Sequence, residues 1–432
     1  MQDFTSLKVA DTGTINESAD FFRKDPTCDT VIVANQGKTA TFMQAWPQIT
    51  TFTLVKGWKQ DTTSKLKEAV NEVVRCNPIL TGTASRSGGF LNTKISITPG
   101  KYLADSHDFV HEIETDAMPE NLQKMNETEV LHFMDEFLAP IVSPAEFVIE
   151  SIESGGPLFG IDVIKLPHDY ACYVVRMSHC VGDGSTYYHI MEEINRALNH
   201  KASHPKAHAP LVWSHPAIAS HEVFPERFSP RDTEISYGVP VFLGLLKNYA
   251  TMKERKKTYI IIDKHKVEQK RKELAIAGNG YLSANDIITS ALCGANLSSE
   301  IFAFTMNMRD RHDHFGGNFH SEIPFFKKSA VDPNAFRSIV KKGFYYDTNK
   351  IPICPFIRGQ VGRISNVATV QKLITADGME VVCHSMLSSF VQNVPLDTAF
   401  IISMNADSYV VLHNFREIDL EDSSLNAILC HH

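Results

Sequence analysis

The chain has 432 residues, more than one hydrophobic core usually serves, so two domains or two similar halves are expected. Hydrophobic residues make up 43% and charged residues 21%, as in an ordinary globular protein, and the net charge of −8 argues against nucleic acid as a partner. The first 22 residues hold four acidic side chains and no apolar run, and no apolar stretch is long enough for a spanning helix. We therefore expect a cytoplasmic protein without a transmembrane segment.

The first elements alternate between strand and helix. Residues 48–58 predict a strand, and the next segment carries a helical apolar stripe that ends at Asn77-Pro78. Residues 90–97 predict another short strand, whereas residues 107–137 are rich in Asp and Glu and predict a solvated face. This order favours mixed α/β layering.

The middle of the chain predicts a hairpin followed by a helix. Residues 159–166 and 170–178 are rich in β-branched and aromatic residues and flank a turn at 167–169. Beyond Gly184, apolar residues recur at the spacing of one helix face. His179 therefore ends a strand and enters a glycine-flanked turn that opens a helix.

This turn is the candidate active site. A neutral imidazole at His179 can act as general base near neutral pH. Asp183 lies at the helix entrance and holds the turn, either by capping the helix or by pairing with an arginine from elsewhere. The alternative is a histidine with no catalytic role beside an aspartate N-cap. Cys180 is a conceivable nucleophile, although neighbouring side chains usually point apart.

The segment after residue 200 predicts a linker. Residues 200–241 are rich in Pro, His and Ser without periodicity, so we predict an N-terminal half at 1–205, a crossover linker at 206–240 and a C-terminal half at 241–432. The linker histidines have no partners at metal-ligand spacing, and the eight cysteines form no C-x-x-C pair. We expect no bound metal.

The second half contains four further patterns. Basic residues surround a strand at 258–262, and Ser283 with Asp286 predicts a capped helix with a buried face. A polar strand end at 305–311 is followed by Gly316-Gly317-Asn318. A hydroxyl pair, Ser388-Ser389, precedes Phe390.

The arrangement His179-x-x-x-Asp183-Gly184, after an apolar strand and near the middle of the chain, resembles the motif of the CoA-dependent acyltransferase superfamily. That superfamily includes plant BAHD acyltransferases, chloramphenicol acetyltransferase and the condensation domains of peptide synthetases. The resemblance implies two chloramphenicol-acetyltransferase-like halves, each a mixed β-sheet with flanking helices, and an active-site tunnel at their interface.

The resemblance also implies roles for particular residues. An arginine of the 305–311 segment, Arg309 or alternatively Arg311, would pair with Asp183, and Asn318 matches the "G-N" that follows it in BAHD enzymes. Ser388 would donate to the oxyanion across the tunnel. The phosphates of CoA would bind basic residues near the strand at 258–262, for which the candidates are Lys253, Arg255, Lys256 and Lys257.

The chain departs from the patterns of two branches of this superfamily, the plant BAHD enzymes and the condensation domains. Where BAHD proteins carry Asp-Phe-Gly-Trp-Gly, this chain has residues 394–400, in which only Asp397 corresponds. Ser178 stands where condensation domains commonly carry a second histidine.

The expected activity is transfer of an acyl group from a CoA thioester to a hydroxyl or amine of a small molecule, with acyl-CoA as cosubstrate and no covalent enzyme intermediate. We expect a monomer with no bound cofactor. The alternatives are a non-catalytic acyltransferase-like scaffold, a wax ester or diacylglycerol synthase, and a carrier-protein-dependent condensing enzyme.

Overall fold

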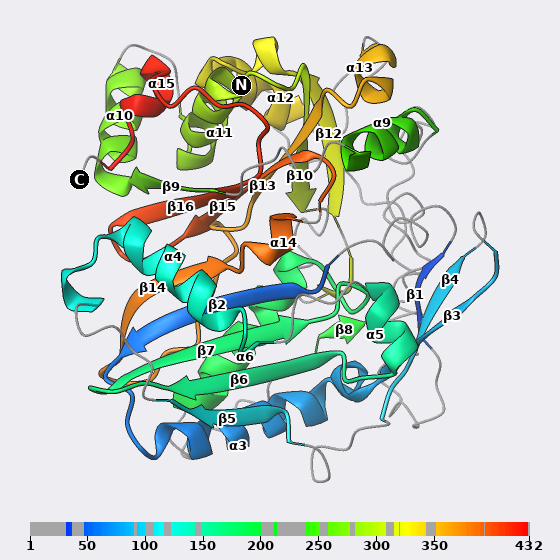
Figure 1. Cartoon of the computed structure of the whole chain (residues 1–432), viewed down its shortest axis with the longest axis vertical. Coiled ribbons are helices and arrows are strands. Elements are labelled where there is room, and N and C mark those ends of the chain that lie inside the picture. The colour runs from blue at the N-terminus through cyan, green and yellow to red at the C-terminus, as the bar shows by residue number, and fades with distance from the viewer. Residues whose placement is uncertain are drawn as a thin grey trace, which may run out of the picture.

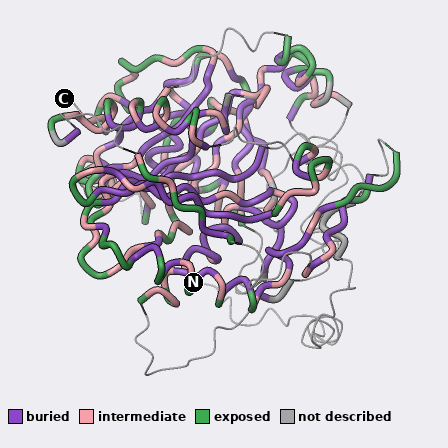
Figure 2. Tube along the Cα trace, turned by 60° about the horizontal axis from the view of Figure 1, so that its bottom comes forward, coloured by how far each residue is buried: buried purple, intermediate pink, exposed green. Residues whose placement is uncertain are grey.

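The computed structural model contains two mixed sheets with helices around them (Figure 1). The residues that it describes are 32–36, 47–89, 93–100, 108–115, 122–142, 148–199, 211–213, 239–250, 258–276, 281–307, 315–318, 320–342, 351–392 and 394–430. Buried residues concentrate in the two sheets, and exposed residues lie on the outer helices and turns (Figure 2).

The first sheet has five strands, and only β5 and β6 run parallel. In spatial order the strands are β14 (Glu380–Met386), β2 (Ile49–Lys56), β7 (Tyr170–Met177), β6 (Phe159–Lys165) and β5 (Val110–Glu114). The predicted strand at 48–58 and the predicted hairpin are confirmed as β2 and as the antiparallel pair β6–β7. The hairpin turn contains His168 and Asp169 at positive φ.

The second sheet has six strands, of which β10, β13 and β15 run parallel to one another. In spatial order they are β12 (His320–Phe326), β10 (Ile301–Asn307), β13 (Val361–Asn366), β15 (Asp397–Ser403), β16 (Ser408–His413) and β9 (Thr258–Asp263). One face buries apolar residues such as Phe302, Phe325, Ile364 and Ile401 in a core that it shares with the helices above it in Figure 1.

Helices cover both sheets. Those of the first half are α3 (Thr62–Cys76), α4 (Glu127–Leu138), α5 (Val148–Ser154) and α6 (Gly184–Asn199). Those of the second half are α9 (Val239–Ala250), α10 (Lys264–Ile276), α11 (Ala284–Ala295), α12 (Pro333–Lys342), α13 (Cys354–Ile357), α14 (Ser389–Gln392) and α15 (Ser423–Asn426). The apolar stripe of α3 is buried as predicted, and Ser283 and Asp286 form the predicted capping box at the start of α11.

Short elements complete the described chain. They are the strands β1 (Ile32–Gln36), β3 (Thr83–Ser87), β4 (Lys94–Thr98), β8 (Val212–Trp213) and β11 (Phe315–Gly316), and the 3-10 turns η1 (Pro78–Thr81), η2 (Leu122–Lys124) and η5 (Lys327–Ser329). The strand predicted at 90–97 corresponds to β4, which begins and ends slightly later, and residues 90–92 lie outside the described part.

One strand of the second half belongs to the first sheet, which the predicted division at residue 241 does not anticipate. β14 belongs by sequence to the C-terminal half but pairs with β2 at the edge of the first sheet. Helix α4, in the segment predicted to be a solvated acidic face, contacts both β14 and β9. Its Glu127 accepts hydrogen bonds from Ser408 at 2.8 and 2.9 Å. The halves are therefore joined through buried contacts; most of the predicted linker lies outside the described residues, and the domain boundaries stay predictions.

Candidate active site

Local hydrogen bonds shape the turn that carries His179. β7 ends at Met177, and the backbone N–H of Val181 then donates to Ser178 at 2.9 Å. At the start of α6 the carboxylate of Asp183 accepts from the backbone N–H of Thr186 at 3.0 Å, as a helix N-cap does. A Cβ on Gly182 would lie 2.6 Å from the side chain of Thr186. Residue 182 must therefore lack a side chain for the turn to close this tightly.

Residues of the second half of the chain form hydrogen bonds with this turn. The Thr186 hydroxyl donates to the carbonyl of Gly317 at 2.8 Å, and the backbone N–H of Asp183 donates to the same carbonyl at 3.3 Å. The amide of Asn318 donates to the backbone carbonyl of His179 at 2.9 Å. The Gly-Gly-Asn segment singled out in the sequence thus holds the backbone from His179 to the start of α6.

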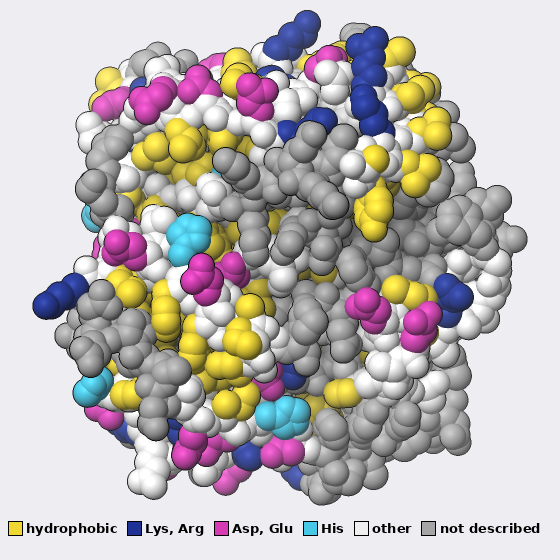
Figure 3. Space-filling model, viewed as in Figure 1, with side chains coloured by type: hydrophobic (Ala, Val, Ile, Leu, Met, Phe, Trp, Pro, Cys, Tyr) yellow, Lys and Arg dark blue, Asp and Glu magenta, His cyan; other side chains and the backbone are white. Residues whose placement is uncertain are grey.

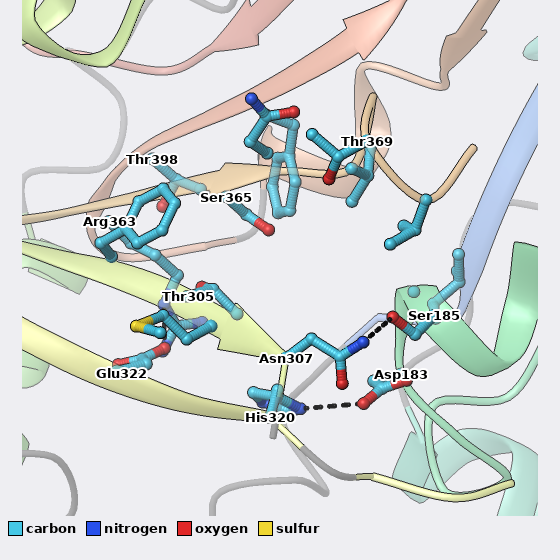
Figure 4. Close-up of a pocket in the computed structure, with 18 of the residues that line it drawn as sticks. Asp183, Ser185, Thr305, Asn307, His320, Glu322, Arg363, Ser365, Thr369 and Thr398 are labelled. Carbon is cyan, nitrogen blue, oxygen red and sulfur yellow. Dashed lines mark hydrogen bonds and ion pairs between the residues drawn. The ribbon is translucent and has the colours of Figure 1, made fainter. Parts of the chain in front are cut away.

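Two side chains from the second sheet reach the same turn (Figure 4). Nδ1 of His320, on β12, lies 3.8 Å from Oδ2 of Asp183, and the amide of Asn307, on β10, donates to the hydroxyl of Ser185 at 3.0 Å. The imidazole rings of His179 and His320 have centroids 6.2 Å apart. The carboxylate of Asp183 therefore faces both its helix and a histidine of the opposite half.

Burial keeps the imidazole of His179 uncharged. It lowers the pKa of His179 to about 4, and the neighbouring His320 lowers it in the same sense. The backbone of His179, the carboxylate of Asp183 and the amide of Asn318 oppose the shift without cancelling it. At neutral pH the imidazole is unprotonated, which is the form that accepts a proton from a substrate.

A cavity of about 570 Å³ opens between the two halves, and His179 and Asp183 lie in its wall. Its apolar lining includes Ile49, Met386, Phe390 and Phe400. A volume of this size falls in the range that holds small-molecule ligands, and such sites commonly lie between domains. The cavity therefore places a neutral histidine against space that a substrate can enter.

One wall of the cavity is a polar face of the second sheet. Alternate residues on its strands point to opposite faces. Phe302 and Ile364 enter the core, and the alternating positions line the cavity with Thr305, Asn307, His320, Glu322, Arg363, Ser365 and Thr398. Arg363 and Glu322 form an ion pair, with 2.6 Å between Nε and Oε1.

The structure does not bring every predicted residue to the cavity. The hydroxyl of Ser388 donates to a carboxylate oxygen of Asp135 on α4, and its backbone N–H donates to the other oxygen at 2.8 Å. Ser388 is buried and is not among the lining residues, so the structure does not place it as the oxyanion donor. Burial raises the pKa of Cys180 to about 11, which disfavours the thiolate that a nucleophile needs.

Several predicted residues lie outside the described part of the chain. These are the arginines proposed to pair with Asp183, Arg309 and Arg311, and the CoA-phosphate candidates Lys253, Arg255, Lys256 and Lys257. Within the same basic stretch, the described Lys264 and Lys266 bind within the protein, donating to Ser403 at 2.7 Å and to the carbonyl of Leu429 at 2.6 Å. In the face that Figure 3 shows, side chains of both charge signs lie over both halves.

Sequence reasoning missed His320 and the Arg363–Glu322 pair, and it gave Asn307, in the segment 305–311, no role of its own. Their signal was period-two alternation over part of each strand, where polar residues such as Thr305, Glu322 and Arg363 alternate with apolar residues. Polar residues on one face of strands whose other face is buried in a core indicate a cavity wall.

In the part of the chain that the structure describes, no three His, Cys, Asp or Glu side chains gather as metal ligands. No helix among the described residues has the length and apolar character needed to cross a membrane.

Two mixed sheets lie on either side of a cavity that holds a neutral histidine in its wall, and strand β14 of the second half joins the first sheet. The structure is similar to that of TRI101 from F. sporotrichioides complexed with coenzyme A and T-2, with a TM-score of 0.54 and 10% identity over 93% of this chain and 99% of that one. It is also similar to polyketide synthase associated protein 5 from Mycobacterium tuberculosis, with a TM-score of 0.54 and 11% identity over 92% and 96% of the two chains. The first condensation domain of the CDA synthetase gives a TM-score of 0.56 and 10% identity over 90% and 91%.

No protein-family model and no curated protein matches the sequence. The likeness to solved structures nevertheless covers nearly the whole chain. The chain therefore has the two-domain fold of CoA-dependent acyltransferases and condensation domains. The resemblance inferred from the His179 motif is confirmed at the level of the fold.

Proposed function

We propose that the protein transfers an acyl group from a CoA thioester to a hydroxyl or amine of a small molecule, with His179 as general base. The observation that carries the proposal is the uncharged imidazole of His179 in the wall of a cavity between the halves. The fold supports it, since solved structures of the same fold contain coenzyme A, ethyl coenzyme A or small-molecule ligands.

The reaction would proceed in two proton steps at one nitrogen. His179 takes the proton of the acceptor as its oxygen or nitrogen attacks the thioester carbonyl. Collapse of the tetrahedral intermediate breaks the C–S bond, and the same proton passes to the departing thiolate. The products are the acylated acceptor and free CoA, and no bond to the enzyme forms.

The other residues of the turn would position the base. Asp183 caps α6 and faces His320, and Asn318 fixes the carbonyl of His179, so each acts on the orientation of the imidazole and not on the substrate. Holding base and substrate in one geometry supplies much of the acceleration in such reactions. Arg309, with Arg311 as the alternative, stays the proposed charge partner of Asp183.

The donor end of the proposal concerns the basic residues Lys253, Arg255, Lys256 and Lys257. If they bind the phosphates of CoA, acyl-CoA should have a lower KM than its dephospho form at low salt, and added salt should remove the difference. Equal KM values at low salt would exclude a contact to the 3′-phosphate. Indifference to the whole nucleotide, with activity on short pantetheine thioesters, would favour a carrier-protein donor.

The decisive experiment is a donor panel. The purified full chain is incubated with acyl-CoAs of increasing chain length and a cell extract, while thiol release and new acylated products are followed. Acceptor-dependent thiol release supports the proposal. Binding of acyl-CoA or of a metabolite without any thiol release would instead favour the non-catalytic scaffold.

A further inference from the structure

The ion pair between Arg363 and Glu322 bridges two strands that are not neighbours. β10 lies between β12 and β13, and the register places Ala303 opposite Arg363 on one side and Pro324 on the other. Because alanine is small, the two long side chains can meet above β10 at the 2.6 Å separation of Nε and Oε1. The pair therefore forms part of the polar cavity wall and is not a surface contact.

Both charges are largely withdrawn from bulk water. The exposed fraction of the side chain is 20% for Arg363 and 9% for Glu322. Desolvating two charges offsets much of their mutual attraction, and an apolar pair often holds strands together equally well. A charged pair in a cavity wall has one property that an apolar pair lacks: it offers a carboxylate acceptor and guanidinium donors to a ligand.

Hydroxyl side chains surround this pair on the same face of the sheet. Thr305 lies opposite Glu322 in the ladder, and Thr398 lies opposite Arg363. Ser365 follows two residues beyond Arg363 and also lines the cavity (Figure 4). Each hydroxyl can donate one hydrogen bond and accept others, so the face can satisfy several hydroxyl groups of a ligand at once.

The charges that line this part of the cavity balance. Arg363 is paired with Glu322, and the second arginine, Arg337, lies 3.6 Å from the buried carboxylate of Asp286. A ligand with a net charge would leave one of these groups without its counter-charge, which is costly away from water. This part of the cavity wall therefore suits an uncharged polar ligand.

The distance between His179 and the Arg363–Glu322 pair allows one ligand to react at His179 and to bind the pair through a second functional group. Glu322 is two residues beyond His320 on β12, or about 7 Å along the strand. With 6.2 Å between the rings of His320 and His179, a group bound at the ion pair lies on the order of 10 Å from the reacting atom. That is the span of a molecule of one or two rings.

We propose that the polar sheet face around Arg363 and Glu322 selects an uncharged, polyhydroxylated acceptor, whose other hydroxyls bind this face while one hydroxyl is acylated at His179. The inference rests on the proposed acyl transfer and names its acceptor class. Glu322 and Arg363 would be specificity-determining residues, and a simple fatty alcohol would be a poor acceptor because it leaves them without ligand hydrogen bonds.

The test compares acceptors that share a ring and differ in hydroxyl groups. Myo-inositol and methyl β-D-glucopyranoside are compared with cyclohexanol, using acetyl-CoA as donor, and kcat/KM for each acceptor is measured in the wild type and in Glu322→Gln. The wild type should prefer the polyols, and Glu322→Gln should lower their kcat/KM by about 10- to 100-fold while leaving cyclohexanol and the KM for acetyl-CoA unchanged.

Two further variants control for loss of structure. Glu268→Gln removes the carboxylate of a matched pair on the surface of α10, where Arg271 lies 2.8 Å away, and should leave acceptor preference unchanged. The double variant Glu322→Gln with Arg363→Met removes both charges and should show the same loss for polyols without a lowered melting temperature. A loss that also appears with cyclohexanol would indicate a structural role and overturn the inference.

Polyol binding measured by calorimetry without donor separates this inference from the proposed function. Binding that weakens in Glu322→Gln, with no transfer in any variant, would refute acyl transfer and retain the polyol site. Transfer to cyclohexanol as efficient as to the polyols would retain acyl transfer and refute the acceptor class. Absence of both polyol binding and polyol transfer at millimolar concentrations would also overturn the inference.

Discussion

The pH dependence of activity follows from the burial of His179. An ordinary histidine has a pKa of about 6.5, so at pH 5.5 only about one tenth of it is neutral. Burial lowers the pKa of His179 to about 4, which leaves about 97% of it neutral at pH 5.5. Burial therefore disfavours the charged form of His179 by about 3 kcal/mol relative to an exposed histidine.

Because kcat/KM reports the ionisation of the free enzyme, it should stay nearly flat from pH 8 to pH 5.5 and fall only as the pH approaches 4. Thiol release can be followed across this range with a dithiodipyridine reagent, which reacts under acidic conditions. Far-ultraviolet circular dichroism at each pH shows that the protein remains folded. A tenfold loss of kcat/KM between pH 7.5 and pH 5.5 would show that His179 titrates as an exposed histidine and would refute the reasoning.

Three further predictions concern stability. Burial lowers the pKa of His384 to about 3, so between pH 6.5 and pH 3 the unfolded chain binds a proton that the folded chain does not. The free energy of unfolding should therefore decrease as the pH is lowered through this range. When the pH is lowered from 7 to 5, His384→Gln should lose about 2 kcal/mol less of this free energy than wild type in urea unfolding, and an equal loss would contradict this. Gly182→Ala should lower the melting temperature and activity because its Cβ would meet Thr186 at 2.6 Å, whereas Gly89→Ala, with open space around it, should change neither. Asp183→Ala should lower the free energy of unfolding by about 1 to 2 kcal/mol through loss of the cap, and Asp183→Asn by less, since it keeps an acceptor oxygen; equal losses would exclude the cap as the cause.

The unit around His179 could be predicted because its information is local. Alternating and β-branched residues define β6 and β7, a helical stripe defines α6, and the glycines mark the turn between them. These patterns depend on neighbours within a few residues, so they are visible in the sequence without knowledge of the tertiary packing.

The contacts between the halves could not be predicted in the same way. His320 follows a polar segment that looks like a solvated turn, and it reaches Asp183 only because β12 pairs with β10. Ser388 was placed by resemblance to a strand that faces the tunnel, but α4 packs beside it and its hydroxyl donates to Asp135. The pairing of β14 with β2 joins segments more than 300 residues apart, which no local pattern records.

Replacement of His179 tests the central claim most directly. The transfer rate of His179→Ala is compared with that of wild type, using the best donor and acceptor from the panels, with the melting temperature as a check of folding. We predict a fall in kcat of about 10²- to 10⁴-fold with the fold intact, as for loss of a general base. A correctly folded His179→Ala protein that transfers acyl groups at the wild-type rate would contradict the claim.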